Sequence, residues 1–345
     1  GQRGGQLGRA ETGIGSRRGV TIVLRAAGGH DLSALYAMAQ TTGGGFVNLP
    51  PDEAKLSERL AAADAAFARD TDRFGVDRFL FVLEDLGSQA IHGTCQIFSH
   101  IGTDAPFYSY RIDRHGADHA VLGRSVDHTT LTICTDHAGC SEVGGLFLRA
   151  DARAGGAGTL LARSRYLFIA MHRPRFADRT IAELRGVVDE AGEAPFWDGI
   201  AARFFGMGFA AADAFNAEHG THVLAGLMPT TPVLLAMLPD SARAVLGVPH
   251  PSGRPALRLL EKEGFRHDHY VDLFDGGPTV TAATDDIATI RSARTAIVRA
   301  VGQCDAAKPA IAAAGRLAGF RACFARIAPQ GDGILLDPDA ARALD

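Results

Sequence analysis

The chain has 345 residues, 46% of them hydrophobic, and a formal net charge of −4 at pH 7, which is enough sequence to bury a large core in one or two domains. The slightly acidic balance argues against nucleic acid or an anionic membrane as the main partner, because both select basic surfaces. No apolar run approaches the roughly 20 residues needed to span a bilayer.

Residues 1–19 are rich in Gly, Arg and Gln and lack the apolar centre of a secretory signal. We therefore expect a disordered leader and a cytoplasmic protein.

The five cysteines are odd in number and scattered, which favours reduced thiols over a disulfide framework. The spacing of Cys134, His137 and Cys140 resembles part of a metal site, with Cys95 as a candidate fourth ligand. A structural zinc normally shows two paired ligand clusters, however, and only one is visible here. Buried thiols without a bound metal are the favoured interpretation.

The first half of the chain combines strand-like and helix-like segments. A polar, His-rich stretch over 104–127 shows no usable periodicity. The expected elements are a strand at 21–25, a helix capped by Asp31, a turn at 42–45, a helix over 52–69, and antiparallel strands at 78–84 and 90–101.

The second half continues this alternation and predicts an α+β fold with a mixed sheet. Trp197, Phe204 and Phe205 recur at helical spacing and are expected in the core. A domain over 20–281 is expected to precede a small unit with weak strands over 282–345. The expected elements are strands at 142–148, 180–188, 222–227 and 269–274, helices over 159–171, 195–205 and 254–263, and a turn at 275–278.

The segment Glu142–Thr159, E-V-G-G-L-F-L-R-A-D-A-R-A-G-G-A-G-T, is the most informative part of the sequence. It predicts an apolar strand, an Arg- and Gly-rich turn, and then a helix. Such a turn directs backbone N–H groups at one point beside a helix N-terminus, which suits a pyrophosphate. The spacing Arg153-x-x-Gly156-x-Gly158 keeps side chains out of the way of a phosphate.

Three common Gly-rich motifs do not fit this turn. A dinucleotide fingerprint needs a small residue where Leu161 stands, and a Walker A loop needs Lys-Ser/Thr after the turn. The stretch 139–143 lacks the second glycine of a hydrolase elbow. The remaining order of strand, R-x-x-G-x-G and helix resembles the acyl-CoA loop of the GNAT superfamily of N-acyltransferases.

A more specific resemblance extends from about Thr21 to Thr281 in one register. The chain resembles the arginine N-succinyltransferase family, while residues beyond 282 match more loosely and stop inside that family's small β-rich tail, so we expect the chain to be truncated or diverged there. The matching segments are T-G-G-G at 42–45 through L-P at 49–50, F-V-L-E-D at 81–85, P-F-Y-S-Y-R at 106–111, S-E at 141–142 through L-F-L at 146–148, A-E-L-R-G at 182–186, A-P-F-W at 194–197, L-M-P at 227–229, H-P at 250–251, L-E-K-E-G-F at 260–265 and F-D-G-G-P at 274–278.

The resemblance implies a GNAT-like fold and transfer of a succinyl group from succinyl-CoA to the α-amino group of L-arginine. Succinyl-CoA would be a substrate, with no permanently bound cofactor. The family pattern places Leu146 on its succinyl-CoA-binding leucine and His250 on its active-site proton donor. It also implies a homo-oligomer, or a mixed oligomer with a paralogous subunit.

The residues themselves leave the chemistry partly open. His250 has a side chain that titrates near neutrality and is held between two prolines, and Glu142 is a competing base if burial raises its pKa. The succinyl carboxylate would prefer a guanidinium, for which Arg111, Arg165 and Arg185 are candidates. An amide from Leu146–Leu148 is the expected oxyanion donor.

The chain departs from the family pattern at two positions near the expected active site. It has Gly226 and Leu234 where the family usually has Glu and Tyr, which leaves the amine substrate open between arginine, ornithine and another amine. A GNAT-type N-acetyltransferase and a non-catalytic subunit of a mixed oligomer are the alternatives.

Overall fold

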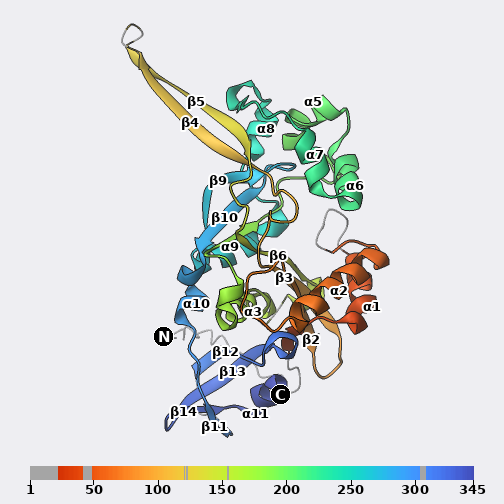
Figure 1. Cartoon of the computed structure of the whole chain (residues 1–345), viewed down its shortest axis with the longest axis vertical. Coiled ribbons are helices and arrows are strands. Elements are labelled where there is room, and N and C mark those ends of the chain that lie inside the picture. Colours follow the sequence, from red (N-terminus) through yellow and green to blue (C-terminus); the bar gives the residue numbers. More distant parts are fainter. Residues whose placement is uncertain (1–21, 42–48, 120, 122, 154, 304–307) are drawn as a thin grey trace, which may run out of the picture.

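A computed structural model describes residues 22–41, 49–119, 121, 123–153, 155–303 and 308–345. The leader predicted at 1–19, the turn predicted at 42–45 and Cys304 lie outside the described residues. The chain forms the mixed α+β structure that the sequence predicts, elongated in Figure 1. No helix in the described part of the chain combines the length and apolarity that crossing a membrane requires.

The strands are β1 (Ile22–Ala26), β2 (Arg78–Asp85), β3 (Ile91–Phe98), β4 (Ser109–His119), β5 (Arg124–Cys134), β6 (Ser141–Leu148), β7 (Arg179–Glu183), β8 (Val233–Leu234), β9 (Arg266–Asp272), β10 (Pro278–Ala283), β11 (Val298–Val301), β12 (Lys308–Ala314), β13 (Arg321–Gln330) and β14 (Gly333–Leu336). The α-helices are α1 (Leu32–Ala39), α2 (Glu53–Ala68), α3 (Ala157–Met171), α4 (Pro195–Gly199), α5 (Ala202–Phe205), α6 (Phe209–His219), α7 (Thr221–Leu227), α8 (Asp240–Val245), α9 (Arg254–Glu263), α10 (Ala288–Ser292) and α11 (Pro338–Leu344).

Among the described residues, the strands form one continuous sheet. Its order is β11-β14-β13-β1-β2-β3-β6-β7-β10-β9-β4-β5-β8, with β12 paired to β13. Neighbours are antiparallel except β6 with β7 and β11 with β14. Because β13 pairs with β1, the C-terminal strands extend the main sheet. The domain boundary expected at residue 282 stays a prediction.

An aromatic core fixes α2 and α3 on one face of the sheet. Phe67 of α2 and Phe168 of α3 have ring centroids 6.0 Å apart, and both contact Phe79 and Phe81, which alternate onto the same face of β2. All four rings are at most 3% exposed. This packing sets the position of the α3 N-terminus against β6.

A second core surrounds Trp197 and includes residues of α6, α7 and α8, which lie in the upper part of Figure 1. Trp197 is fully buried, stacks on Phe205 and Phe274, and donates its indole N–H to the Met207 carbonyl oxygen. Phe204 is 58% exposed, so its predicted core position is wrong. The predicted helix over 195–205 is interrupted, because Ile200 has a non-helical backbone between α4 and α5.

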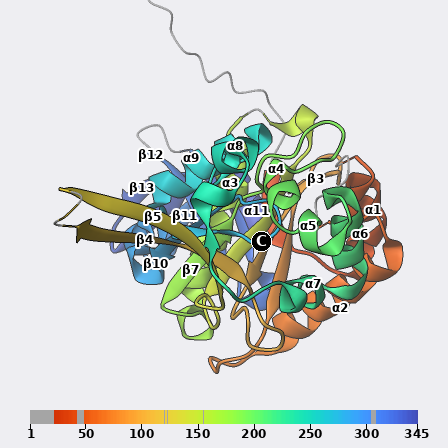
Figure 2. The same cartoon turned by 90° about the horizontal axis from the view of Figure 1, so that it is seen from above.

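Two further segments differ from the sequence predictions. Residues 222–227, predicted as a strand, belong to helix α7, whose Leu224 and Ala225 pack into the second core. The unassigned stretch over 104–127 contributes most of a long hairpin, β4–β5, which projects from the body in Figures 1 and 2. Asp31 stands at the start of α1 without capping it, since its carboxylate pairs with Arg25 and accepts the Gly28 N–H.

A buried ion pair links α2 to the chain after α3. Arg175 is 1% exposed and donates to Asp77 at 2.9 Å and to the carbonyl oxygens of Ala66 and Arg69. Arg175→Met should lower the free energy of unfolding by about 3 kcal/mol, because the Asp77 carboxylate keeps only Arg69 as a cationic partner and two carbonyl oxygens lose their donor. Denaturant titration measures this loss. The control Arg173→Ala, which breaks exposed ion pairs, should cost about 1 kcal/mol or less, and equal losses would contradict the prediction.

Candidate active site

The strand, turn and helix predicted from Glu142 to Met171 are present. β6 leads through a short 3₁₀ turn at Ala150–Ala152 into α3. Gly155 and Gly156 have φ of +67° and +82°, a left-handed backbone that favours glycine. The Thr159 amide donates to the Gly156 carbonyl oxygen, and the amides before it, at the start of α3, precede the first intrahelical acceptor, so the α3 N-terminus is a natural anion site.

The edge of β6 that faces β7 is paired over only two residues. Ser141 and Glu142 pair with Thr180 and Ile181, after which the two parallel strands separate. The remainder of β6 keeps β3 as its partner on the opposite edge. Beyond Glu142, β7 no longer covers this edge of β6, so an extended substrate arm can bond to the backbone there, in the manner of an added strand.

A β-bulge distorts β6 beside this gap. Gln96 of β3 pairs with Gly144 and Thr94 pairs with Phe147, so β6 contains one extra residue. Gly145 takes φ of +57°, and a Cβ there would approach the Gln96 side chain to within about 3.0 Å. Because a bulge interrupts the ladder and turns the backbone, it can aim an amide into the gap as an oxyanion donor.

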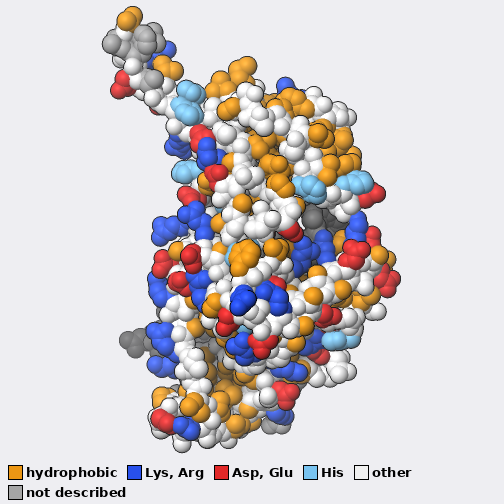
Figure 3. Space-filling model, in the orientation of Figure 1, with side chains coloured by type: hydrophobic (Ala, Val, Ile, Leu, Met, Phe, Trp, Pro, Cys, Tyr) orange, Lys and Arg blue, Asp and Glu red, His pale blue; other side chains and the backbone are white. Residues whose placement is uncertain are grey.

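A cavity of about 1550 Å³ begins at this gap. It exceeds the roughly 300–1,000 Å³ of ordinary small-molecule sites, as a site for two substrates would. Its walls come from β6, α3, the end of β7, α1, α6 and the turn after residue 250. In Figure 3 the same face of the molecule is hollowed between α6 and the α1–α2 pair, with basic side chains in the hollow.

The residues predicted for the acyl-CoA loop lie in two settings. Leu146, Arg153 and Gly158 line the cavity, and Arg153 also donates to the Leu148 carbonyl oxygen. Gly156 lies outside the lining, and a Cβ on it would meet the Phe324 ring at 3.1 Å. Gly156 thus shapes the turn against β13.

The predicted histidine lies at the edge of the same cavity. His250 is half-buried, its backbone N–H donates to the Arg185 carbonyl oxygen at 2.8 Å, and its Nδ1 lies 2.7 Å from Ser252 Oγ and accepts the Ser252 N–H. This contact leaves Nε2 to carry the proton of the neutral ring. Burial, and secondarily the Arg185 charge, lowers the pKa of His250, so the ring is neutral at pH 7. Ser252 lines the cavity, whereas His250 does not.

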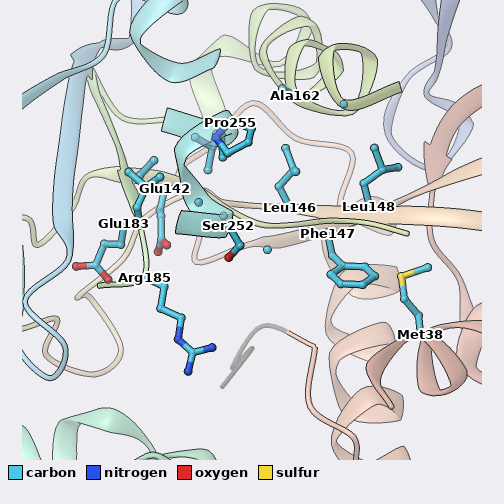
Figure 4. Close-up of a pocket in the computed structure, with 18 of the residues that line it drawn as sticks. Met38, Glu142, Leu146, Phe147, Leu148, Ala162, Glu183, Arg185, Ser252 and Pro255 are labelled. Atoms are coloured by element: carbon cyan, nitrogen blue, oxygen red, sulfur yellow. The ribbon is translucent and has the colours of Figure 1, made fainter. Parts of the chain in front are cut away.

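Two carboxyl groups stand where β6 and β7 separate, and Figure 4 shows them side by side. Burial raises the pKa of Glu142 to about 7, against the opposing field of Arg78. The pKa of Glu183 is raised well above its usual value by burial and by the nearby charges of Asp272 and Glu142. The protonated form of Glu183 is therefore favoured, and Glu142, with a pKa of about 7, is half ionised at neutral pH, which suits proton acceptance.

Among the candidate arginines, Arg185 extends into the open cavity in Figure 4. Arg165 also lines the cavity but is 4% exposed and donates to the carbonyl oxygens of Ala162 and Gly144. Arg111 lies on β4 in ion pairs with Asp113 and Asp136, away from the lining. The structure therefore favours Arg185 as the cation that meets a substrate carboxylate.

Close backbone contacts fix the segment that carries Glu183 and Arg185. A Cβ on Gly186 would lie 2.3 Å from the Asp275 carbonyl oxygen, and one on Gly277 would lie 2.0 Å from that of Leu184. The predicted turn at 275–278 thus packs backbone against backbone on the end of β7. Gly247 also donates to the Gly276 carbonyl oxygen, so the loop before His250 joins the same unit.

Several cavity residues were not predicted from the sequence. The only sequence feature that indicates Glu183 is its position as an acidic residue in a short apolar strand. No local sequence pattern indicates Asp213, Asn216 or Asp272. Gly226 and Leu234, the two departures from the family pattern, lie outside the lining. No group of three or more His, Cys, Asp or Glu within the described ranges could hold a metal ion. Cys95 and Cys140 are buried, and the ring of His137 packs against Tyr270.

Comparison with known proteins points to one family. The sequence model of the family described as "Arginine N-succinyltransferase beta subunit" matches residues 22–289. The family model of that subunit's C-terminal domain matches residues 293–345. The chain is 38% identical over 275 residues to the arginine N-succinyltransferase of Citrobacter koseri, covering 79% of each protein. It is 37% identical over 309 residues to that of Salmonella paratyphi B, covering 89% of each.

A solved structure gives the same result. The arginine/ornithine succinyltransferase subunit AI from Pseudomonas aeruginosa superposes with a TM-score of 0.85 at 31% identity. The match covers 94% of this chain and 96% of that one. The fold, including the C-terminal strands, is therefore common to the two proteins.

Proposed function

Because the chain belongs to the arginine N-succinyltransferase family, we propose that it transfers the succinyl group of succinyl-CoA to the α-amino group of L-arginine. The products are N2-succinylarginine and free CoA. The observation that carries this proposal is the separation of β6 from β7 after Glu142, beside the α3 N-terminus, in a cavity that continues to Glu142 and Glu183.

The donor occupies the β6–α3 side of the cavity. Its pantetheine arm bonds to the β6 backbone at Leu146–Leu148, and its pyrophosphate lies at the first turn of α3 beside Gly158. Arg153 supplies a cation near the phosphates, and Gly156 holds the turn in its left-handed conformation. The bulge at Gly144–Gly145 directs an amide at the thioester oxygen, where negative charge develops during attack.

Two protons leave the acceptor nitrogen during the reaction. The amine binds as an ammonium and gives its first proton to Glu142, whose pKa of about 7 suits a base. The free amine attacks the thioester carbon, and the C–S bond breaks. Neutral His250 gives the proton on its Nε2 to the departing thiolate, and the second amine proton reaches its Nδ1 through a water molecule and Ser252 Oγ. One proton is released per amide formed.

A substrate carboxylate pairs with Arg185. The guanidinium of this residue extends into the cavity between the succinyl-CoA side and the acceptor side of the site. This position is supported by the hydrogen bond from the His250 N–H to the Arg185 carbonyl oxygen. The segment after β7 thereby carries the Arg185 side chain, which binds the anion, and holds the loop of His250, which transfers the proton.

Thiol release tests the proposal. Purified protein is assayed with succinyl-CoA and acetyl-CoA as donors, each with arginine, ornithine and lysine as acceptors. We expect release with succinyl-CoA and arginine, and ornithine is included because the solved relative from Pseudomonas aeruginosa is an arginine/ornithine succinyltransferase subunit. Release with acetyl-CoA alone would favour the N-acetyltransferase alternative. Release with none of the pairs would favour a non-catalytic subunit.

A further inference from the structure

One wall of the cavity is a face of α6 to which the proposed chemistry assigns no role. Phe209, Asp213 and Asn216 stand at positions i, i+4 and i+7 of this helix, so they share one side of it. All three line the cavity. The face offers a carboxylate and an amide with an aromatic ring beside them.

Asn216 is a buried polar residue with an unused acceptor. Its side chain is 6% exposed, and its carbonyl oxygen Oδ1 accepts no hydrogen bond from any described residue. Buried side-chain acceptors are normally satisfied. An N–H donor that arrives with a ligand would satisfy this one.

Asp213 stands one turn before Asn216 and is half-buried. No hydrogen bond or ion pair joins its carboxylate to another residue of the described ranges. Burial raises its pKa, with Arg185 acting against this shift and Asp272 adding to it. A ligand cation at Asp213 would restore the ionised form and compensate for the desolvation of the carboxylate.

The position of α6 is fixed across the cavity from β6. Lys55 of α2 donates to the Ala217 carbonyl oxygen at 2.7 Å. In Figure 1 α6 lies above the α1–α2 pair, and residues of both α1 and α6 line the cavity. The α6 face therefore meets the end of a substrate that lies far from the CoA loop.

We propose that Asp213 and Asn216 bind the cationic side-chain head of the acceptor and select a guanidinium over an ammonium or a neutral head. A guanidinium presents five N–H donors in one plane, so it can bond a carboxylate through two of them and Asn216 Oδ1 through a third. An ammonium directs its three donors from a single atom. This inference rests on the proposed function for the other end of the acceptor, where Glu142 meets the α-amino group.

Asp213→Asn tests the inference, because it removes the charge and keeps the shape. The KM for arginine should rise about 10- to 100-fold, the range expected for a charged hydrogen bond, while the KM for succinyl-CoA stays unchanged. The preference for arginine over citrulline, its neutral counterpart, should fall by a similar factor. Asn216→Leu should raise the KM for arginine about 2- to 10-fold. Glu218→Gln, on the exposed face of α6, is the control and should change neither constant.

An unchanged arginine-to-citrulline preference in Asp213→Asn would overturn the inference. So would an equal rise in the KM values for arginine and succinyl-CoA, which indicates a general disturbance of the cavity. Calorimetric titration of arginine into the CoA-saturated protein separates the two proposals. Suppose that the wild-type protein releases no thiol in the assay above but binds arginine in this titration, and that Asp213→Asn weakens the binding. The proposed function then fails and the subsite stands. Equal binding by both proteins removes the subsite.

Discussion

His250→Ala is expected to fold like the wild-type protein and to lose about 10²- to 10⁴-fold in kcat, the range for loss of a proton-transfer group. Its neutral ring offers a basic nitrogen at the cavity edge, and the Ser252 and Arg185 backbone contacts hold it in place. Without it, the amine proton must reach the thiolate through bulk water. KM for both substrates should change little, because the imidazole is assigned to the chemical step.

The matched control for this substitution is His267→Ala. His267 also has a lowered pKa caused by burial, but its ring bonds to the Tyr270 carbonyl oxygen and lies outside the cavity lining. Steady-state kinetics and circular dichroism should show both variants folded and only the first inactive. Near-wild-type turnover by His250→Ala would remove His250 from the mechanism.

Glu142→Gln is expected to lose about 10²- to 10³-fold in kcat at pH 7, within the usual range for a general base. In the wild-type protein, activity should rise with pH through about 7, because the ionised form of Glu142 accepts the proton and its pKa lies there. The Glu142→Gln variant should lack this rise of activity with pH. Its activity should recover as the pH passes 8, where an α-amino group loses its proton to solution.

The kcat profile from pH 5.5 to 9.5 measures this difference. Glu261→Gln, an exposed carboxylate on α9, is the control and should keep the wild-type profile. If Glu142→Gln shows the same pH limb as the wild-type protein, another group carries the first proton, and Glu142 has only a structural role at the end of β6.

The strand, turn and helix proposed to hold the donor could be predicted from the sequence because they are contiguous. Strand, glycine turn and helix follow one another from Glu142 to Met171, and the left-handed backbone at Gly155 and Gly156 demands residues that a sequence displays directly. Helix α9 was equally readable, since Gly264, with φ of +100°, ends it. In both cases the local backbone determines the residue type.

The elements predicted wrongly or left unassigned are those that distant packing decides. The T-H-V-L-A-G-L stretch of α7 is short and apolar, so its pattern suits a strand or a helix, and the core around Trp197 selects the helix. The β4–β5 hairpin is exposed over much of its length and lacks the apolar alternation that marks a half-buried strand. Its register depends on mutual pairing, which composition does not reveal.

The acceptor side was predicted only in part for the same reason: His250 and Arg185 were candidates, whereas Glu183 and Asp213 were not. Glu183, Arg185, Asp213 and His250 come from β7, the segment after it, α6 and the loop before α9. No spacing rule connects residues this far apart in the chain. The sheet order and the contact between the Gly186 and Gly277 backbones bring Glu183, Arg185 and His250 together, and packing in the core around Trp197 places α6.

That glycine contact also bears on how such an enzyme can be redesigned. It unites the end of β7, the 275–277 turn and the loop before His250, and leaves α6 outside. Replacing α6 with a different helix should therefore change which acceptor head group the enzyme binds, while the proton-transfer residues keep their positions. The modular boundary for engineering new amine substrates runs between α6 and this unit.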